Sequence, residues 1–331
     1  MAILAPTAEN LARAADLLRA GRLVGLPTET VYGLAADALN PAAVRGIFAA
    51  KGRPADHPLI VHLPSAEHLP QWAERIPREA IALARAFWPG PLTLILRRSD
   101  EVPDEVTGGQ DTVGLRVPGH PVALALLTAF GSGLAAPSAN RFGRISPTSA
   151  QHVVEELGEA VAAVLDGGPC EVGIESAILD LSREQPVLLR PGAISAEAIA
   201  AVIGRRPREA AEETAGLAQA PRVSGALAAH YAPRTPLRLV APAEMAQTLT
   251  ALAGRRLAVL SREHAQGEAE LWIRAPQEPA AYAQELYANL RRLDAQGAEW
   301  MLVEAPPVTP EWRAVADRLG RAATGSGQGE V

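Results

Sequence analysis

The chain has 331 residues, of which 48% are hydrophobic, and its formal net charge is −6. This length suits two domains of ordinary size, and the apolar content is enough for a buried core in each. The negative charge excludes a general basic field for nucleic acid, so any RNA contact would need a local patch or a partner protein. A single cysteine, Cys170, excludes a disulfide framework and a cysteine-based zinc site within the chain.

The N-terminal segment, Met1 to Ala20, alternates apolar and charged residues and predicts an amphipathic helix, with Thr7 as its N-cap and Gly21 at its end. It does not have the pattern of a secretory signal peptide. No apolar run approaches the roughly 20 residues that a membrane span needs. We therefore expect a cytoplasmic protein that does not cross a membrane.

The first two hundred residues mix short apolar runs, typical of strands, with amphipathic stretches, typical of helices. The two kinds of element are interleaved without strict alternation, which predicts an α/β or α+β fold with a mixed sheet. Helices are expected at residues 7–20, 41–50, 65–74, 77–87, 121–130, 148–157 and 196–203, and strands at 22–26, 59–63, 92–98, 113–117, 163–165, 176–181 and 187–190.

The pattern changes after Gly204, where a stretch rich in Arg, Glu and Ala has no apolar periodicity and is followed by several prolines. Beyond it, strands (237–240, 256–260, 271–274, 301–304) alternate with helices (242–253, 279–295, 311–323), which predicts a small Rossmann-like α/β module with a parallel sheet. We divide the chain into a first domain at 1–207, a linker at 208–236, a small α/β domain at 237–324 and a disordered tail at 325–331.

Lys51 is the only lysine of the chain, whereas arginine occurs 30 times. A compact ammonium and a planar guanidinium are not equivalent in a tight anionic pocket, so a functional lysine is one explanation. The other is a drift of composition toward arginine that left one lysine by accident. We expect this side chain to be partly exposed and to contribute little to stability.

Small hydroxyl and amide residues accompany arginines on turns bounded by Gly and Pro, while P-loop, GxGxxG, HExxH and GxSxG motifs do not occur. Such donors suit an anionic ligand that carries phosphates and a carboxylate. No nucleophile–base pair stands out, which favours chemistry by positioning and charge neutralisation. The candidates are Thr28, Thr30, Tyr32, Lys51, Arg53, Thr112, Arg116, Ser138, Asn140, Arg144, Ser146, Ser176 and Arg190.

Each candidate also has an ordinary structural explanation. Thr28 and Thr30 could satisfy turn backbone, the arginines could be solvated surface residues, and Ser138 with Asn140 could form only a cap and a turn. His57 and His62 could be core or rim histidines, since two histidines without a third ligand make a weak metal site. From its residues alone, the chain is an anion- or nucleotide-binding α/β protein.

Eight blocks along the first two hundred residues resemble the threonylcarbamoyl-AMP synthase family, and they follow one another in the family's order. His230-Tyr231-Ala232-Pro233 and the α/β module after it resemble the longer, two-domain branch of the family. The blocks are Leu26–Leu34 (LPTETVYGL), Ile47–Pro54 (IFAAKGRP), Pro58–His62 (PLIVH), Trp88–Thr93 (WPGPLT), Val113–Pro118 (VGLRVP), Ala136–Asn140 (APSAN), Gly173–Ser176 (GIES) and Leu189–Gly192 (LRPG).

The resemblance implies a nucleotidyltransferase that joins L-threonine, bicarbonate or CO2, and ATP into threonylcarbamoyl-AMP and releases pyrophosphate, with Mg2+ accompanying the ATP. This reaction would be the first step of N6-threonylcarbamoyladenosine formation in ANN-reading tRNAs, and a partner tRNA threonylcarbamoyl transferase machinery would then use the product. A weak direct contact with tRNA is left open. The family's fold is a twisted mixed sheet with surrounding helices and a large concave, positively charged cavity.

Site residues follow from the resemblance position by position. Lys51 and Arg53 would be catalytic, binding the phosphates and the bicarbonate-derived group, and Tyr231 would close over ATP from a linker lid. Contacts with ATP are expected from Lys51, Arg53, His57, Arg116, Ser138, Asn140, Ser146, Arg190 and Tyr231. Contacts with threonine are expected from Thr30, His62, Thr112, Ala136 and Ser176. The metal would be bound through ATP and not by protein ligands.

Two departures from the family pattern and two alternatives accompany this interpretation. His57 stands where an Asn is usual, and Arg222–Ala226 stands where family members often have a Pro-Gly-Met run, so the ATP contact and the lid could differ in detail. One alternative is a non-catalytic module of the same fold that binds RNA or tRNA. The other is a carbamoyl-transfer domain of the hydrogenase-maturation type, but a single cysteine excludes the zinc fingers that accompany it.

Overall fold

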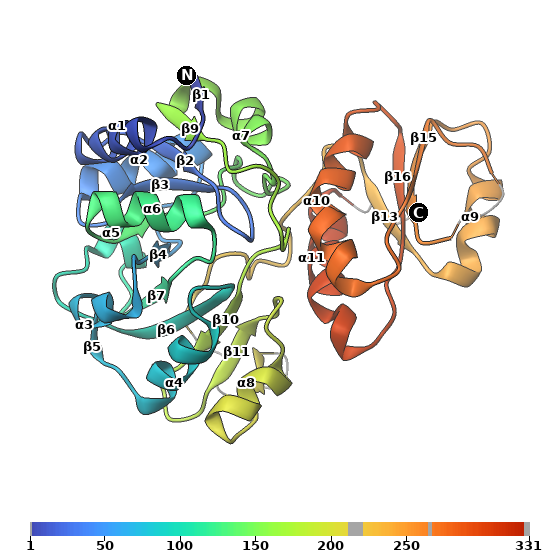
Figure 1. Cartoon of the computed structure of the whole chain (residues 1–331). Helices are drawn as coiled ribbons and strands as arrows, with labels where there is room; N and C mark the ends of the chain where they lie inside the picture. The colour runs from blue at the N-terminus through green and yellow to red at the C-terminus, as the bar shows by residue number, and fades with distance from the viewer. Residues whose placement is uncertain (1, 211–220, 264–266, 328–331) are drawn as a thin grey trace. The chain divides into compact units, whose positions relative to one another are not determined.

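A computed structural model of the protein describes residues 2–210, 221–263 and 267–327, which fall into two compact units (Figure 1). The first unit contains the described residues of Met1–Phe142, Pro147–Glu171 and Glu175–Ala226. The second contains those of Gly143–Ser146, Val172–Ile174 and Leu227–Val331. The expected linker at 208–236 falls partly on residues 211–220, which lie outside the described residues.

The described strands of unit 1 form one sheet of twelve strands, and its mixed character confirms the prediction from the sequence. Its order is β1-β9-β2-β3-β8-β4-β7-β6-β10-β11-β12, with β5 beside β6. The strands are β1 (Ala2–Leu4), β2 (Val24–Leu26), β3 (Gly33–Asp37), β4 (Ile60–His62), β5 (Ala73–Arg75), β6 (Leu92–Arg98), β7 (Thr112–Arg116), β8 (Leu134–Ala135), β9 (Ala163–Leu165), β10 (Ala177–Asp180), β11 (Val187–Arg190) and β12 (Arg208–Glu209).

The helices of unit 1 carry the end signals that their sequence predicts. Thr7 caps α1 through its hydroxyl, and Asn40 caps α2, which begins with a proline and ends at Gly52 in the left-handed conformation (φ 62°). The helices are α1 (Ala8–Arg19), α2 (Pro41–Lys51), α3 (Leu69–Trp72), α4 (Arg78–Phe87), α5 (Asp104–Thr107), α6 (Pro121–Phe130), α7 (Ala150–Leu157) and α8 (Ala196–Ile203), with 3-10 turns η1 (Ala66–His68) and η2 (Gly158–Ala160).

One predicted helix was wrong, and the edge strand β1 was not predicted. The N-terminal helix begins at Ala8, directly after the predicted cap Thr7, and Ala2–Leu4 before it is extended and pairs in parallel with β9. The helix expected at 65–74 is a 3-10 turn and the single-turn helix α3, and its last residues form β5, which pairs with β6. In both cases a sheet edge offers backbone hydrogen bonds that a local pattern cannot show.

The central strands of unit 1 have one apolar face and one polar face. Leu92, Leu94 and Leu96 of β6 lie in the main hydrophobic core, which also contains buried residues of α4 and α8. Thr93 and Ile95 alternate with these leucines and therefore lie on the opposite face. A second core lies among α1, α6 and the strands β1, β2 and β9. The face that the main core leaves open is the one from which the candidate site residues project.

Unit 2 contains a parallel four-stranded sheet of order β13-β16-β14-β15, which confirms the predicted α/β module. Helix α11 includes Gly325, whereas residues 328–331 of the expected tail lie outside the described residues. In the described ranges, no helix combines the length and apolarity that crossing a membrane requires. The elements are β13 (Leu237–Val240), η5 (Pro242–Glu244), α9 (Met245–Ala251), β14 (Leu257–Ser261), β15 (Leu271–Arg274), α10 (Pro279–Asp294), β16 (Trp300–Glu304), η6 (Pro310–Trp312) and α11 (Arg313–Gly325).

Candidate active site

Strand register places polar side chains on one face of the unit 1 sheet. His62 of β4 pairs with Arg116 of β7, so both side chains leave the same face. Leu94 pairs with Leu115, which puts Thr93 on the same face as Arg116. Ile178 of β10 pairs with both Thr93 and Arg190, so the Arg190 side chain shares this face too. Strands β4, β7, β6 and β11 thus present imidazole, guanidinium and hydroxyl groups on one face, and β10 contributes the apolar Ile178 between β6 and β11. We call this the polar face.

Arg116 forms a buried cluster at the turn between β2 and β3. Its Nη1 donates to Oγ1 of Thr30 at 2.9 Å, its Nε donates to the carbonyl of Gly90 at 3.1 Å, and its Nη2 lies 2.7 Å from Oε1 of Glu29. Only 4% of the Arg116 side chain and 8% of the Glu29 side chain are exposed. An ion pair shielded from water in this way has a stronger Coulomb attraction than a surface pair, but it also loses hydration.

The hydroxyl groups of Thr28 and Thr30 have defined proton directions. Thr28 has one hydroxyl proton, and its Oγ1 lies 2.6 Å from the carbonyl oxygen of Val31, which can only accept. In the 2.9 Å contact between the two hydroxyls, Thr30 is therefore the donor. Because Arg116 donates to Thr30 as well, the Thr30 oxygen offers a ligand an acceptor lone pair and not a proton.

Arg190 organises a second cluster on the polar face. It donates from Nε to the carbonyl of Ser176 at 3.0 Å, from Nη2 to the Ser176 hydroxyl at 3.2 Å, and from Nη1 to the carbonyl of Ser224 at 2.8 Å. The Ser176 hydroxyl also contacts Oγ1 of Thr93 at 2.8 Å. Arg53 reaches the hydroxyl of Ser224 at 3.5 Å. Two guanidinium groups predicted to bind ATP therefore approach the same residue, Ser224.

Lys51 is buried, with 3% of its surface exposed, so the expectation of a partly exposed side chain was wrong. Its Nζ donates to the carbonyl oxygens of Ser138 and Asn140 at 2.5 and 2.6 Å. Burial and the nearby Arg53 lower the pKa of Lys51, while the two carbonyl acceptors favour its charged form. An ammonium has three N–H donors, so one remains for a ligand beyond the two carbonyls.

The two histidines named from the sequence have different surroundings. Burial and the Arg116 charge lower the pKa of His62 to about 3, so this imidazole is neutral at physiological pH. His57 is half-buried and packs edge-on against Phe142, with ring centroids 5.3 Å apart. Burial and Arg53 lower the pKa of His57 as well. Both imidazole rings are therefore uncharged at physiological pH and can act as hydrogen-bonding groups.

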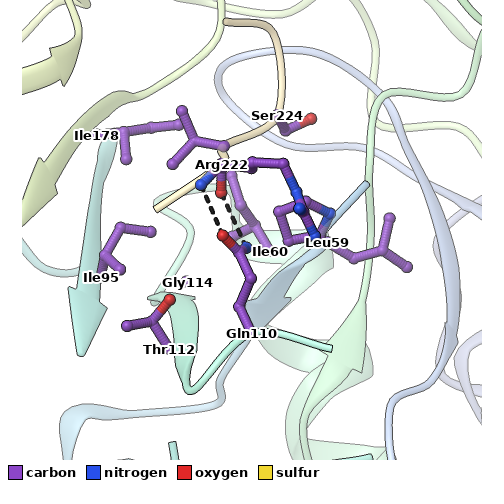
Figure 2. A pocket seen from close by; sticks show the side chains of 11 residues that line it. Leu59, Ile60, Ile95, Gln110, Thr112, Gly114, Ile178, Arg222 and Ser224 are labelled. Atoms are coloured by element: carbon purple, nitrogen blue, oxygen red, sulfur yellow. Dashed lines mark hydrogen bonds between the residues drawn. The ribbon is translucent and has the colours of Figure 1, made fainter. Parts of the chain in front are cut away.

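A small pocket, partly open to solvent, lies on the polar face (Figure 2). Its floor includes Ile60, Ile95, Thr112, Gly114 and Ile178, which share this face by strand register. Figure 2 shows that one wall is the segment that contains Arg222 and Ser224. The pocket therefore combines an apolar floor with a polar rim, as ligand pockets usually do.

The side-chain amide of Gln110 holds that wall in place. Its Oε1 accepts from the backbone N–H of Arg222 at 2.7 Å, and its Nε2 donates to the carbonyl of the same residue at 3.1 Å (Figure 2). The next residue, Val223, is buried with Ile95 and Ile178. Arg222 and Val223, which belong to the run that departs from the family pattern, thus pack on the sheet of unit 1.

The structure brings most of the predicted residues together within unit 1. Lys51, Ser138 and Asn140 share hydrogen bonds, as do Thr30 with Arg116 and Ser176 with Arg190. Ala136 lies beyond β8, two residues after Leu134, the partner of His62, and so on the polar face. Ser146 and Tyr231 belong to unit 2, and their predicted contacts with ATP stay predictions.

Within unit 2, Tyr231 is buried and has a positive φ of 61°, an uncommon conformation for a residue with a side chain. Its ring packs edge-on against His230, with centroids 4.2 Å apart, and lies 5.6 Å from the Tyr287 ring. The Arg318 guanidinium lies 5.7 Å from its centroid. Surrounding rings and a cation therefore hold this backbone conformation.

Several residues of the two clusters escaped sequence reasoning. Glu29 was read only as part of its motif, although its position between two threonines, in a turn after a buried strand, is an unusual place for a carboxylate. Thr93 is the one hydroxyl in an apolar run, which was a usable signal. Gln110 and Ser224 gave no local signal, because their roles depend on partners more than thirty residues away. The described residues contain no group of three His, Cys, Asp or Glu side chains that could hold a metal ion.

Two family models cover most of the chain. A model described as telomere recombination, of the Sua5/YciO/YrdC group, matches residues 16–192. A model described as the C-terminal domain of threonylcarbamoyl-AMP synthase matches residues 194–324.

Similar proteins agree with these models. A threonylcarbamoyl-AMP synthase from Bacillus subtilis is 40% identical over 96% of this chain and 93% of its own length. One from Pyrococcus abyssi is 53% identical over 58% of this chain, and the match spans 56% of that relative's length. A crystal structure of P. abyssi Sua5 complexed with L-threonine superimposes with a TM-score of 0.91 at 37% identity, over 98% of both chains.

Proposed function

Because this chain belongs to the threonylcarbamoyl-AMP synthase family, we propose that it joins L-threonine, bicarbonate or CO2, and ATP into threonylcarbamoyl-AMP, releasing pyrophosphate. The observation that carries the proposal is the polar face. One sheet face holds Arg116 with Thr30 at one position and Arg190 with Ser176 at the next. Such a face suits one ligand that has a carboxylate and another that has phosphates.

The threonine carboxylate binds to Arg116. The family resemblance gave this residue to the nucleotide, but its neighbours here are Thr30 and His62, both expected at threonine. The guanidinium has five N–H groups, and its three nitrogens each have one near acceptor, so two N–H groups remain for a carboxylate. Neutral His62 leaves the local charge unchanged and can hydrogen-bond a hydroxyl.

The phosphates of ATP bind among Lys51, Arg53 and Arg190. Carboxylation of the threonine amine gives a carbamate that loses CO2 readily, so it must attack the α-phosphate quickly and away from water. The free N–H of Lys51 neutralises charge on the attacking carboxylate and the leaving pyrophosphate. Arg53 and Arg190 hold the phosphates after these displace the contacts with Ser224.

Magnesium accompanies ATP in this proposal, because Mg2+ prefers phosphate oxygens and water over an all-protein cage, and it would neutralise charge on the phosphates. The product, a mixed anhydride, is consumed by a tRNA-modifying transferase that uses the threonylcarbamoyl group. A cytoplasmic location follows from that partner. The reaction class is nucleotidyl transfer, because AMP moves from pyrophosphate to the carbamate oxygen.

Pyrophosphate release tests the proposal directly. The full chain is incubated with ATP and Mg2+, and threonine or bicarbonate is left out in turn. We expect release only when both are present. Release with neither would identify a nucleotide hydrolase and contradict the proposal, and release with threonine alone under CO2-free conditions would identify an ordinary amino-acid adenylating enzyme.

A further inference from the structure

Glu29 is a buried carboxylate with too few hydrogen-bond donors. Its residue is 6% exposed, and its Oε1 forms an ion pair with Nη2 of Arg116 at 2.7 Å, but neither carboxylate oxygen has a hydrogen-bond partner among the described residues. An ionised carboxylate has about four acceptor positions, so the arrangement leaves acceptor capacity unused. Leaving such capacity unmet in a buried site is costly, which makes this a site where a ligand donor gains free energy.

The geometry next to this carboxylate favours a ligand with both charges. Arg116 keeps two N–H groups for an anion, and Glu29 offers an acceptor oxygen directly beside it. An α-amino acid carries an ammonium and a carboxylate on one carbon, so its two charges lie close together, as do those of Glu29 and Arg116. The ion pair of Glu29 and Arg116 therefore presents the complementary charges in the complementary order.

We propose that Glu29 binds the α-ammonium of the amino-acid substrate while Arg116 binds its α-carboxylate, so that this buried pair selects a zwitterion. The inference rests on the proposed function and assigns a residue of the same site. It explains why a buried carboxylate lies beside Arg116 on a sheet face whose other charged groups are cations.

The test compares two ligands that differ only at the amine. 3-Hydroxybutyrate keeps the carboxylate and the β-hydroxyl of threonine but has no α-ammonium. Dissociation constants of both are measured by calorimetry on the full chain, for the wild type and for Glu29→Gln. We expect Glu29→Gln to weaken threonine binding by about 10- to 100-fold, as for a hydrogen bond to a charged group, and to leave 3-hydroxybutyrate within about threefold.

Glu209→Gln is the matched control, because Glu209 is also buried and paired with an arginine, Arg206 at 3.2 Å, but lies outside the site. It should leave both constants unchanged. Glu29→Asp keeps the negative charge and should retain part of the preference for threonine, which provides a second variant if the glutamine form does not fold.

The outcomes separate the two claims. Equal losses for both ligands, or no loss for either, would overturn the inference, because Glu29 would then act only through Arg116 or not at all. A wild type that binds 3-hydroxybutyrate as tightly as threonine would overturn it without any variant. If the wild type binds threonine but Glu29→Gln does not lose affinity for threonine selectively, the inference about Glu29 fails and the proposed function is unaffected. If it binds neither ligand, both fail.

Discussion

Each unit of the molecule contains a buried glutamate that is paired with an arginine, and the two pairs differ in how the carboxylate is satisfied. In unit 2, Arg262 contacts Oε1 of Glu304 at 2.5 Å, and Oε2 of that glutamate accepts the backbone N–H of Arg262 at 2.8 Å. The same guanidinium lies 5.3 Å from the Trp312 ring centroid. In unit 1, among the residues that the structure describes, Arg116 is the only charged group close to the Glu29 carboxylate, and neither oxygen accepts a hydrogen bond.

The difference separates a structural ion pair from one that can bind a ligand. The Glu304 carboxylate sits at the end of β16, beside the end of β14, where backbone amides complete its hydrogen bonds. Its charge is balanced within the fold, so substitution should change stability and leave ligand affinity alone. The Glu29 carboxylate lies in a turn that gives it no hydrogen-bond donor among the described residues, so a bound ligand would have to supply one.

The largest expected effect is the loss of activity when Lys51 of unit 1 is replaced. Lys51→Ala should lower the rate of adenylate synthesis by at least about 10²- to 10³-fold, because a preorganised cation at the reacting phosphate is lost. It should also lower the free energy of unfolding by about 1–3 kcal/mol, since the carbonyls of Ser138 and Asn140 lose their donor. Initial rates and urea unfolding measure the two effects.

Lys51→Arg tests whether the reaction needs an ammonium at this position or only a positive charge. A planar guanidinium cannot reproduce the two short contacts of a compact ammonium in this space, so turnover should again fall far below that of the wild type. Near-normal turnover of the arginine variant would mean that the lone lysine is an accident of composition. Near-normal turnover of the alanine variant would remove Lys51 from the mechanism.

Glu304→Gln is the counterpart in unit 2. We expect a loss of about 1–3 kcal/mol in the free energy of unfolding, because a buried charged hydrogen-bond network loses its anion. The KM for threonine should stay within about twofold, as measured on the folded variant at low temperature. A raised KM with unchanged stability would reverse the assignment of the two ion pairs.

The stability of unit 1 should also depend on pH, because His62 is buried on the polar face. Its pKa falls from 6.5 to about 3 on folding, so below pH 6.5 the unfolded chain binds a proton that the folded chain does not. The contribution of this group to the free energy of unfolding is therefore fully present above pH 6.5 and is lost as the pH falls toward 3. Between pH 6 and 4.5, the loss from this group should be about 2 kcal/mol.

His62→Gln should remove that contribution, so the variant should lose less stability than the wild type over the same interval. Urea unfolding at the two pH values measures the difference between the slopes. Identical pH dependence in both proteins would show that His62 is not held neutral.

The smallest effect is expected at Thr93. Thr93→Val keeps the side-chain shape and removes one hydrogen bond to Ser176, which should cost about 0.5–1.5 kcal/mol of unfolding free energy. Because Ser176 keeps its contact with Arg190, the KM for ATP should change by less than about threefold. A larger kinetic effect would place Thr93 among the groups that contact a ligand.

The fold was predictable where local pattern and tertiary packing agree. The apolar run of β11 and the helix α8 were predicted with the bounds that the structure has, since each has clear end signals and one buried face. β1 was missed because a three-residue edge strand is defined by its pairing with β9 and not by its own sequence. Sheet order was not readable, since it depends on contacts between distant strands.

The site was predictable as a set of residue types and not as a geometry. Family resemblance placed His62, Arg116 and Arg190, and strand register explains why they share a face. Exposure was misjudged for Lys51, because its acceptors lie 87 and 89 residues further along the chain. The role of Glu29 was invisible, since one sequence does not show which oxygen of a carboxylate has a partner.

Isotope labelling gives the most direct test of the account. The wild type is supplied with ATP, Mg2+, 13C-bicarbonate and 15N-threonine, and the nucleotide products are resolved by mass spectrometry. We expect an AMP adduct that carries both labels and forms in step with pyrophosphate. An adduct with the nitrogen label alone, or ADP and phosphate without an adduct, would contradict it.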